Sequence, residues 1–184
     1  GSLYSINNKT MKIIWFINLN QSNDLNPSNL FLGNQIVNFN KKIIVTSNKF
    51  TYIINKENGV IDFKFNFSSL IKPVANNDNA YLISKNNLLI CLNLKSGKIL
   101  YSYNINEMIS NFLKIKKKKA KFKTLVIAGD KINIFLSNSY VLKIDAAGKL
   151  TDIVKLPRKI KSFPIFSQNN LIYLDKKNKI SVIN

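Results

Sequence analysis

The sequence predicts an all-β fold, a β-propeller built of four-stranded antiparallel blades, on three observations. Short apolar runs separated by polar turns follow one another along the 184 residues. The same strand–turn–strand pattern recurs at Leu3, Thr51, Leu89 and Val141. One unit of four strands takes about 40 residues, the period of a propeller blade, whereas a helical solenoid would need an apolar period of about 3.6 residues. We expect about four blades, forming half of a larger ring.

The recurring hairpins turn at equivalent positions, which are occupied by Met11, Gly59, Gly97 and Gly148. Glycine suits such a tight connection because one residue of the turn usually needs a positive φ. Met11 departs from this pattern, so we expect a looser or slightly strained turn in the first copy.

A large aromatic residue follows each of the first three turns at the same distance: Trp15, Phe63 and Tyr101. The fourth copy has Asp152 at this position, with Ile153 beside it. We interpret the fourth copy as divergent.

Further pairs of apolar runs precede these hairpins and complete the units. Pro73 and Pro164 fall at the first strand of a unit, where proline removes no ladder hydrogen bond. We expect a single partial propeller domain over 1–184, divided into a partial blade at 1–20, blades at 34–67, 72–105 and 123–156, a lysine-rich insertion at 106–122, and a partial terminal blade at 160–184. Because an open stack exposes apolar faces and sheet edges, we expect either a longer chain or a second copy to complete the ring.

The composition favours anionic partners but also has a simpler explanation. The formal net charge is +19, with 28 Lys and Arg residues against nine Asp and Glu. Such an excess suits acidic proteins, lipid head groups or nucleic acid. The chain is also rich in Asn, Lys and Ile, as expected if coding bias fills tolerant surface positions. Both explanations remain open at this point.

The sequence offers few groups for catalysis. It contains no histidine, the commonest general base and metal ligand. The single cysteine, Cys91, lies in an apolar run and is expected in the core. Aspartates in or beside hairpin turns are expected to cap backbone N–H groups; they are Asp62, Asp130, Asp145 and Asp152. With no phosphate-binding loop, zinc spacing or Ser-His-Asp set, we expect neither an enzyme nor a cofactor or metal site.

The repeats resemble the propeller repeats of the pyrroloquinoline-quinone type (PQQ-like repeats). The resemblance is carried by "GSLYSINNKTMKIIW" from Gly1 and "CLNLKSGKILY" from Cys91. The order of the units, the lysine-rich insert before "LVIAGDKINIFLSN" and the ending "FPIFSQNNLIYLDKKNKISVIN" are similar, more narrowly, to the C-terminal half of the BamB-type lipoproteins of the outer-membrane β-barrel assembly machinery.

This resemblance implies an eight-bladed, non-enzymatic scaffold in the bacterial periplasm, anchored to the outer membrane in full-length members. The implied partners are the barrel-assembly core subunit and unfolded outer-membrane proteins. In that family, the partner contacts include acidic residues before a blade's first strand. The matching segment here, Asn29–Gln35, contains no acidic residue, so the resemblance assigns no contact residue in this chain. A PQQ-dependent dehydrogenase-like propeller is one alternative, although those enzymes use adjacent cysteines. A basic propeller that binds an anionic surface is another.

The lysine-rich segment is the first candidate partner-binding site. Such dense positive charge predicts an exposed, mobile loop, suited to acidic protein or an anionic membrane surface. Nucleic acid is disfavoured because Phe122 is the one aromatic residue among the lysines. A solvated loop without function is the alternative. The lysines are Lys114, Lys116, Lys117, Lys118, Lys119, Lys121 and Lys123.

The loops between blades are the second candidate. A propeller brings these loops to one face, where recognition residues often lie. The predicted loops are Gln21–Gln35, Asn66–Lys72, Asn104–Thr124 and Lys155–Phe163. The first of them carries four apolar residues, Leu25, Leu30, Phe31 and Leu32, which either dock a partner or pack between blades. A partner strand added to a blade edge is a further mode of binding.

Overall fold

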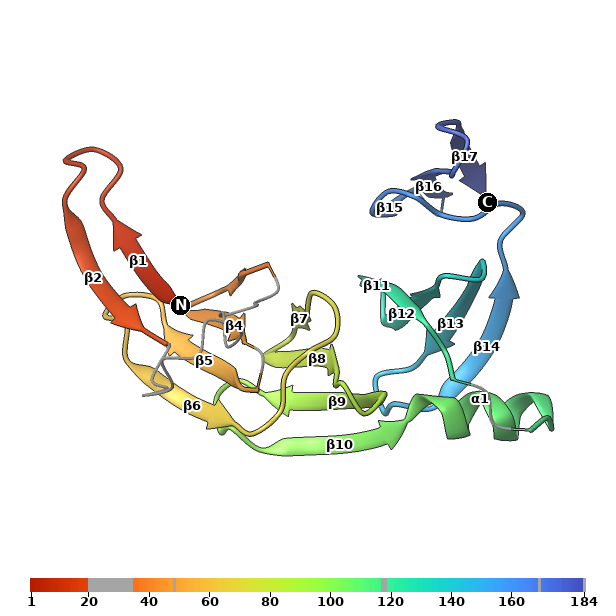
Figure 1. Ribbon diagram of the computed structural model, residues 1–184, viewed down its shortest axis with the longest axis horizontal. Helices are drawn as coiled ribbons and strands as arrows, with labels where there is room; N and C mark the ends of the chain where they lie inside the picture. The colour runs from red at the N-terminus through yellow and green to blue at the C-terminus, as the bar shows by residue number, and fades with distance from the viewer. Residues whose placement is uncertain (20–34, 48, 117–118, 169, 184) are drawn as a thin grey trace, which may run out of the picture.

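The computed structural model describes residues 1–19, 35–47, 49–116, 119–168 and 170–183. Within these residues, five antiparallel sheets follow one another in chain order and form an open arc (Figure 1). A two-stranded sheet stands at one end of the arc, three four-stranded sheets follow, and a three-stranded sheet stands at the other end. The all-β prediction is therefore confirmed. Each sheet is called a blade below.

Within every blade, strands that are consecutive in the chain are neighbours in the sheet. The first blade contains β1 (Ser2–Ile6) and β2 (Ile13–Asn18). The second contains β3 (Val37–Phe39), β4 (Lys42–Thr46), β5 (Thr51–Asn55) and β6 (Ile61–Phe65). The third contains β7 (Val74–Asn76), β8 (Asn79–Ile83), β9 (Leu88–Asn93) and β10 (Ile99–Asn104).

One helix, α1 (Ile105–Leu113), separates the third blade from the fourth. The fourth blade contains β11 (Phe122–Ala128), β12 (Lys131–Leu136), β13 (Tyr140–Ile144) and β14 (Leu150–Lys155). The fifth contains β15 (Ile165–Ser167), β16 (Asn170–Leu174) and β17 (Ile180–Ile183). Pro73 and Pro164 directly precede β7 and β15, as the sequence predicts.

The core lies between blades and not within one of them. Four buried apolar clusters each combine side chains from two successive blades. Inner strands are consequently covered on both faces, and β5 and β9 each bury four consecutive residues. The outer strand β10, in contrast, is largely exposed. Cys91 lies in the cluster between the third and fourth blades, so its prediction as a core residue is confirmed.

The repeated glycines and aromatic residues form contacts between blades. Gly59 and Gly97 have φ of +75° and +68°. A Cβ on Gly59 would lie 2.7 Å from the ring of Trp15, and one on Gly97 would lie 2.4 Å from the ring of Phe63. Each aromatic ring therefore occupies the space that the glycine of the next blade leaves open. The ring of Tyr101 lies against Gly148 in the same way.

Met11 has φ of +56°, which confirms the slightly strained turn expected there. A positive φ is unfavourable for a residue with a side chain, because Cβ approaches the backbone. The Met11 side chain is 75% exposed. The first turn thus keeps the backbone shape of the other copies without their glycine.

The prediction of a continuous loop over Asn104–Thr124 is wrong in its first half, because α1 occupies Ile105–Leu113. Ile105 is fully buried, and Met108 and Ile109 pack against the core cluster between the third and fourth blades. This spacing of three and four residues is the apolar stripe of a helix. The repulsion between lysines that predicted a loop acts only beyond the end of α1.

Candidate functional site

The start of α1 is held firmly in place. The Asn104 side-chain oxygen accepts hydrogen bonds from the N–H groups of Asn106 and Glu107, at 3.0 and 3.3 Å. This N-cap satisfies two N–H groups that have no partner within the helix. Ile105, directly after the cap, is buried in the core. The helix is therefore fixed against the outer side of the third and fourth blades.

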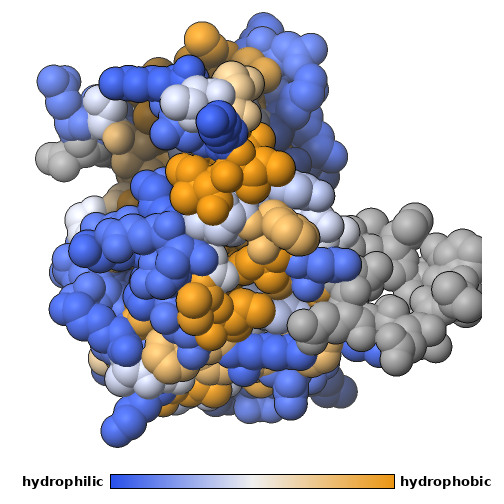
Figure 2. Space-filling view, turned by 90° about the vertical axis from the view of Figure 1, so that its left-hand side faces the viewer, coloured by the Kyte–Doolittle hydropathy of each residue, from blue (hydrophilic) through white to orange (hydrophobic). Residues whose placement is uncertain are grey.

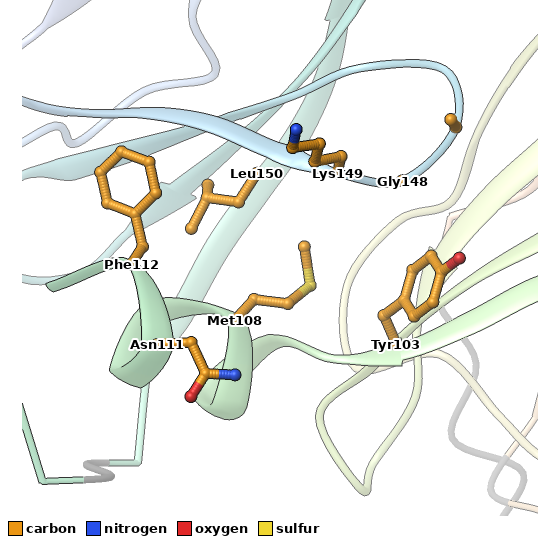
Figure 3. Close-up of a pocket in the computed structure, with 8 residues that line it drawn as sticks. Tyr103, Met108, Asn111, Phe112, Gly148, Lys149 and Leu150 are labelled. Atoms are coloured by element: carbon orange, nitrogen blue, oxygen red, sulfur yellow. The ribbon is translucent and has the colours of Figure 1, made fainter. Parts of the chain in front are cut away.

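A groove of about 400 Å³ lies between α1 and the turn that joins β13 to β14. Figure 3 shows Met108 and Phe112 extending from α1 toward the segment that carries Lys149 and Leu150, with Tyr103 at the other end of the groove. Two polar residues, Asn111 and Lys149, also line the groove. The site is therefore an apolar recess with an amide and an ammonium group at its border. We call it the α1 groove.

The side of the α1 groove that β10 forms through Tyr103 depends on a contact between blades at Gly148. The rings of Tyr101 and Tyr103 are stacked, with centroids 5.2 Å apart. A Cβ on Gly148 would lie 2.6 Å from Tyr101 and 2.7 Å from Tyr103. The turn therefore approaches both rings only because residue 148 is glycine. Sequence reasoning identified Tyr101 and Gly148 separately but did not identify the groove that their contact creates.

The pKa values of Cys91 and Tyr101, which lie next to this side of the groove, are both raised. Burial raises the pKa of the Cys91 thiol, while the nearby hydroxyl groups of Tyr81 and Tyr101 oppose the rise. Burial also raises the pKa of Tyr101 far above its ordinary value, and the neighbouring Cys91 adds to this rise. Since a thiolate is the reactive form of cysteine, the burial and the raised pKa of Cys91 both disfavour its reaction at neutral pH.

The described lysines of the lysine-rich segment are all exposed: Lys114, Lys116, Lys119, Lys121 and Lys123. None of them forms an ion pair within the part of the chain that the structure describes. Lys114 follows α1 directly, so the segment begins next to the α1 groove. Lys117 and Lys118 lie outside the described residues, as do the predicted docking residues Leu25, Leu30, Phe31 and Leu32. A binding role for these residues remains a prediction.

Carboxylates in the described blades serve turns and ion pairs. Lys42 Nζ lies 2.9 Å from Asp62, and the Asp145 side chain accepts from the N–H of Lys149 at 2.8 Å. Asp175, which sequence reasoning did not single out, is the most buried of them. It accepts from the N–H groups of Lys177 and Lys179, at 2.7 and 3.0 Å, and pairs with Arg158 at 3.0 Å.

These interactions lower the pKa of Asp175, with the Lys179 N–H as the largest cause and Arg158 next. Among the described residues, no group of three or more His, Cys, Asp or Glu side chains is placed to hold a metal. No helix in the described part of the chain is long and apolar enough to cross a membrane.

Both ends of the arc present apolar side chains. At the first blade, Tyr4 and Phe16 stack with centroids 5.9 Å apart and are more than half exposed. Figure 2 faces this end and shows apolar side chains gathered among hydrophilic ones. At the fifth blade, Ile180 and Val182 are also more than half exposed. The end faces thus have the character expected of an open stack of blades.

No protein-family model matches the sequence, and no curated protein is significantly similar to it. Solved structures do match. BamB from Moraxella catarrhalis superposes with a TM-score of 0.74 at 13% identity, covering 99% of this chain and 52% of that chain. The fold is a partial β-propeller. This chain therefore spans about half the length of the BamB structure.

Two other solved structures agree at the level of the fold. BBS1N, solved in complex with ARL6DN, matches with a TM-score of 0.66 at 11% identity, over 100% of this chain and 59% of that chain. The computationally designed Ika8 protein matches with a TM-score of 0.60 at 8% identity, over 80% of this chain and 44% of that chain. At these identities the similarity concerns the arrangement of strands, and function must be argued from the site.

Proposed function

We propose that this propeller is a non-enzymatic, protein-binding scaffold that assists the assembly of outer-membrane β-barrel proteins. Its place of action is the periplasm, at the outer membrane. The observation that carries the proposal is the superposition on BamB over nearly the whole chain. The structure of BBS1N in complex with ARL6DN, another match at the level of the fold, supports a role in binding a partner.

The α1 groove is the contact that we assign to the partner. Binding energy at protein interfaces concentrates on a few apolar or aromatic anchors that fill recesses. The groove offers Met108, Phe112 and Leu150 to such an anchor, and Lys149 at its border suits an acidic group beside it. Because α1 is capped and anchored in the core, the recess exists before the partner arrives, and little ordering entropy is lost on binding.

A pull-down from a native bacterial extract tests the proposal. We expect the immobilised chain to retain the core subunit of the barrel-assembly machinery. Phe112→Glu places a charge in the apolar recess and should abolish retention. Val60→Glu is the matched control, because Val60 is exposed in the turn between β5 and β6 and does not line the groove. Failure of the native chain to retain the core subunit, or equal losses in both variants, would contradict the proposal.

A further inference from the structure

The end of α1 carries a second feature, which the α1 groove does not use. Leu113 and Ile115 are nearly half exposed, and they alternate with the exposed Lys114 and Lys116. We propose that this end of α1, together with Lys119 and Lys121, docks onto an anionic lipid surface. The inference concerns a different partner from the proposed scaffold function and does not depend on it.

The alternating residues are held in a defined shape. Lys114 adopts a left-handed conformation with φ of 52°, and its N–H donates to the Ser110 carbonyl. The Ile115 N–H donates to the same carbonyl at 3.1 Å, and the Ser110 hydroxyl donates to the Ile115 carbonyl at 2.6 Å. Leu113 and Ile115 therefore project from a closed turn. An ordered turn loses less conformational entropy on docking than a free coil would.

The later lysines are also tied to α1. The Ala120 N–H donates to the side-chain oxygen of the buried Asn106 at 2.8 Å. This bond returns the chain to the first turn of the helix, with Lys119 and Lys121 on either side of Ala120. Lys114 and Lys116 thus lie beside the two exposed apolar residues at the end of α1, and Lys119 and Lys121 lie near the beginning of the helix. None of these four lysines forms an ion pair with another described residue.

An anionic membrane surface matches this chemistry better than a peptide or a nucleic acid does. Lipids supply an apolar layer beneath negative head groups, so apolar side chains insert while lysines extend to the phosphates. Figure 1 places α1 on the outer side of the arc, where a flat surface can approach. A peptide would need a recess, and Leu113 and Ile115 do not line the α1 groove. Phe122, the aromatic residue that could stack on a base, packs against the core instead.

Vesicle co-sedimentation tests the inference, with phosphatidylcholine vesicles and vesicles of phosphatidylcholine mixed with phosphatidylglycerol. We expect binding to the anionic vesicles only, and weaker binding as salt is added. A lysine near a charged surface contributes about fivefold to partitioning, so replacing Lys114, Lys116 and Lys119 with Gln should reduce it about a hundredfold. Replacing Leu113 and Ile115 with Ser should also reduce it, at unchanged net charge.

The matched control replaces Lys9, Lys12 and Lys176 with Gln, which removes the same charge from exposed positions in the first and fifth blades. This variant should keep most of the binding, and circular dichroism should show that all variants are folded. Equal losses in the two triple variants would overturn the inference, because net charge alone would then explain binding. So would full binding by the Ser variant, equal binding to neutral vesicles, or binding to polyglutamate but not to vesicles.

Discussion

Single aromatic residues join neighbouring blades of this propeller. Trp15, Phe63 and Tyr101 each cover the turn glycine of the following blade. Trp15 also donates from Nε1 to the Lys56 carbonyl at 3.0 Å, within the turn that it covers. The contact requires both a ring on one blade and the absence of a side chain on the next. One substitution can therefore separate two blades without altering either sheet.

Gly97→Ala tests this contact at the residue scale. The added Cβ would meet Phe63 at 2.4 Å, in a backbone with φ of +68°. Backbone strain and overpacking together should reduce the free energy of unfolding by about 2–4 kcal/mol in urea denaturation. Gly129→Ala is the control, because Gly129 has φ of +61° but nothing within 4 Å of its added Cβ. It should cost about 1 kcal/mol, and equal losses would show that the ring contact contributes nothing.

Asp175 makes the stability of the folded chain depend on pH in a predictable direction. Its pKa is lowered in the folded chain, so its contribution to stability is complete above the ordinary value of about 3.9 and is lost as pH falls through the folded pKa. Asp175→Asn should therefore be less stable than the native chain at neutral pH. The difference in the free energy of unfolding should shrink as the solution is acidified below about pH 4. A difference independent of pH would contradict this account.

At the scale of elements, α1 shapes both proposed binding sites, since Met108 and Phe112 line the groove and Leu113 ends the helix. Its N-cap is accordingly a sensitive position. Asn104→Ala should cost about 1 kcal/mol of stability and raise the hydrogen-exchange rate of the first amides of α1. Asn111→Ala is the control, because Asn111 is exposed within the helix and alanine has the better helix propensity. Similar hydrogen-exchange rates of these amides in both variants would contradict a stabilising role for the Asn104 cap.

The strands were predictable from sequence because each is a short apolar run bounded by turn residues, and β5 and β9 show this most clearly. Helix α1 was missed because the dense lysines beyond it dominated the interpretation, although the spacing of Ile105, Met108 and Ile109 indicated a buried stripe. The α1 groove could not be predicted. It forms where α1 meets the turn before β14, and local patterns do not record which distant segments meet.

At the scale of the whole molecule, the exposed apolar side chains at the two end faces should determine whether copies of the chain associate. Contiguous exposed apolar patches promote association between proteins. We therefore expect sedimentation analysis to show association of the 184-residue chain that increases with concentration. Phe16→Glu, on the outer face of the first blade, should weaken it, whereas Val60→Glu should not. A single monomeric species at every concentration would contradict this expectation.

The most direct test of the scaffold proposal is a calorimetric titration of the chain with the purified periplasmic domains of the barrel-assembly core subunit. We predict saturable binding that Phe112→Glu abolishes and Val60→Glu preserves, because Phe112 lines the α1 groove and Val60 does not. The Gln replacements at Lys114, Lys116 and Lys119 should leave this binding largely intact, which separates it from docking on lipid. A flat titration with the native chain would contradict the proposed function.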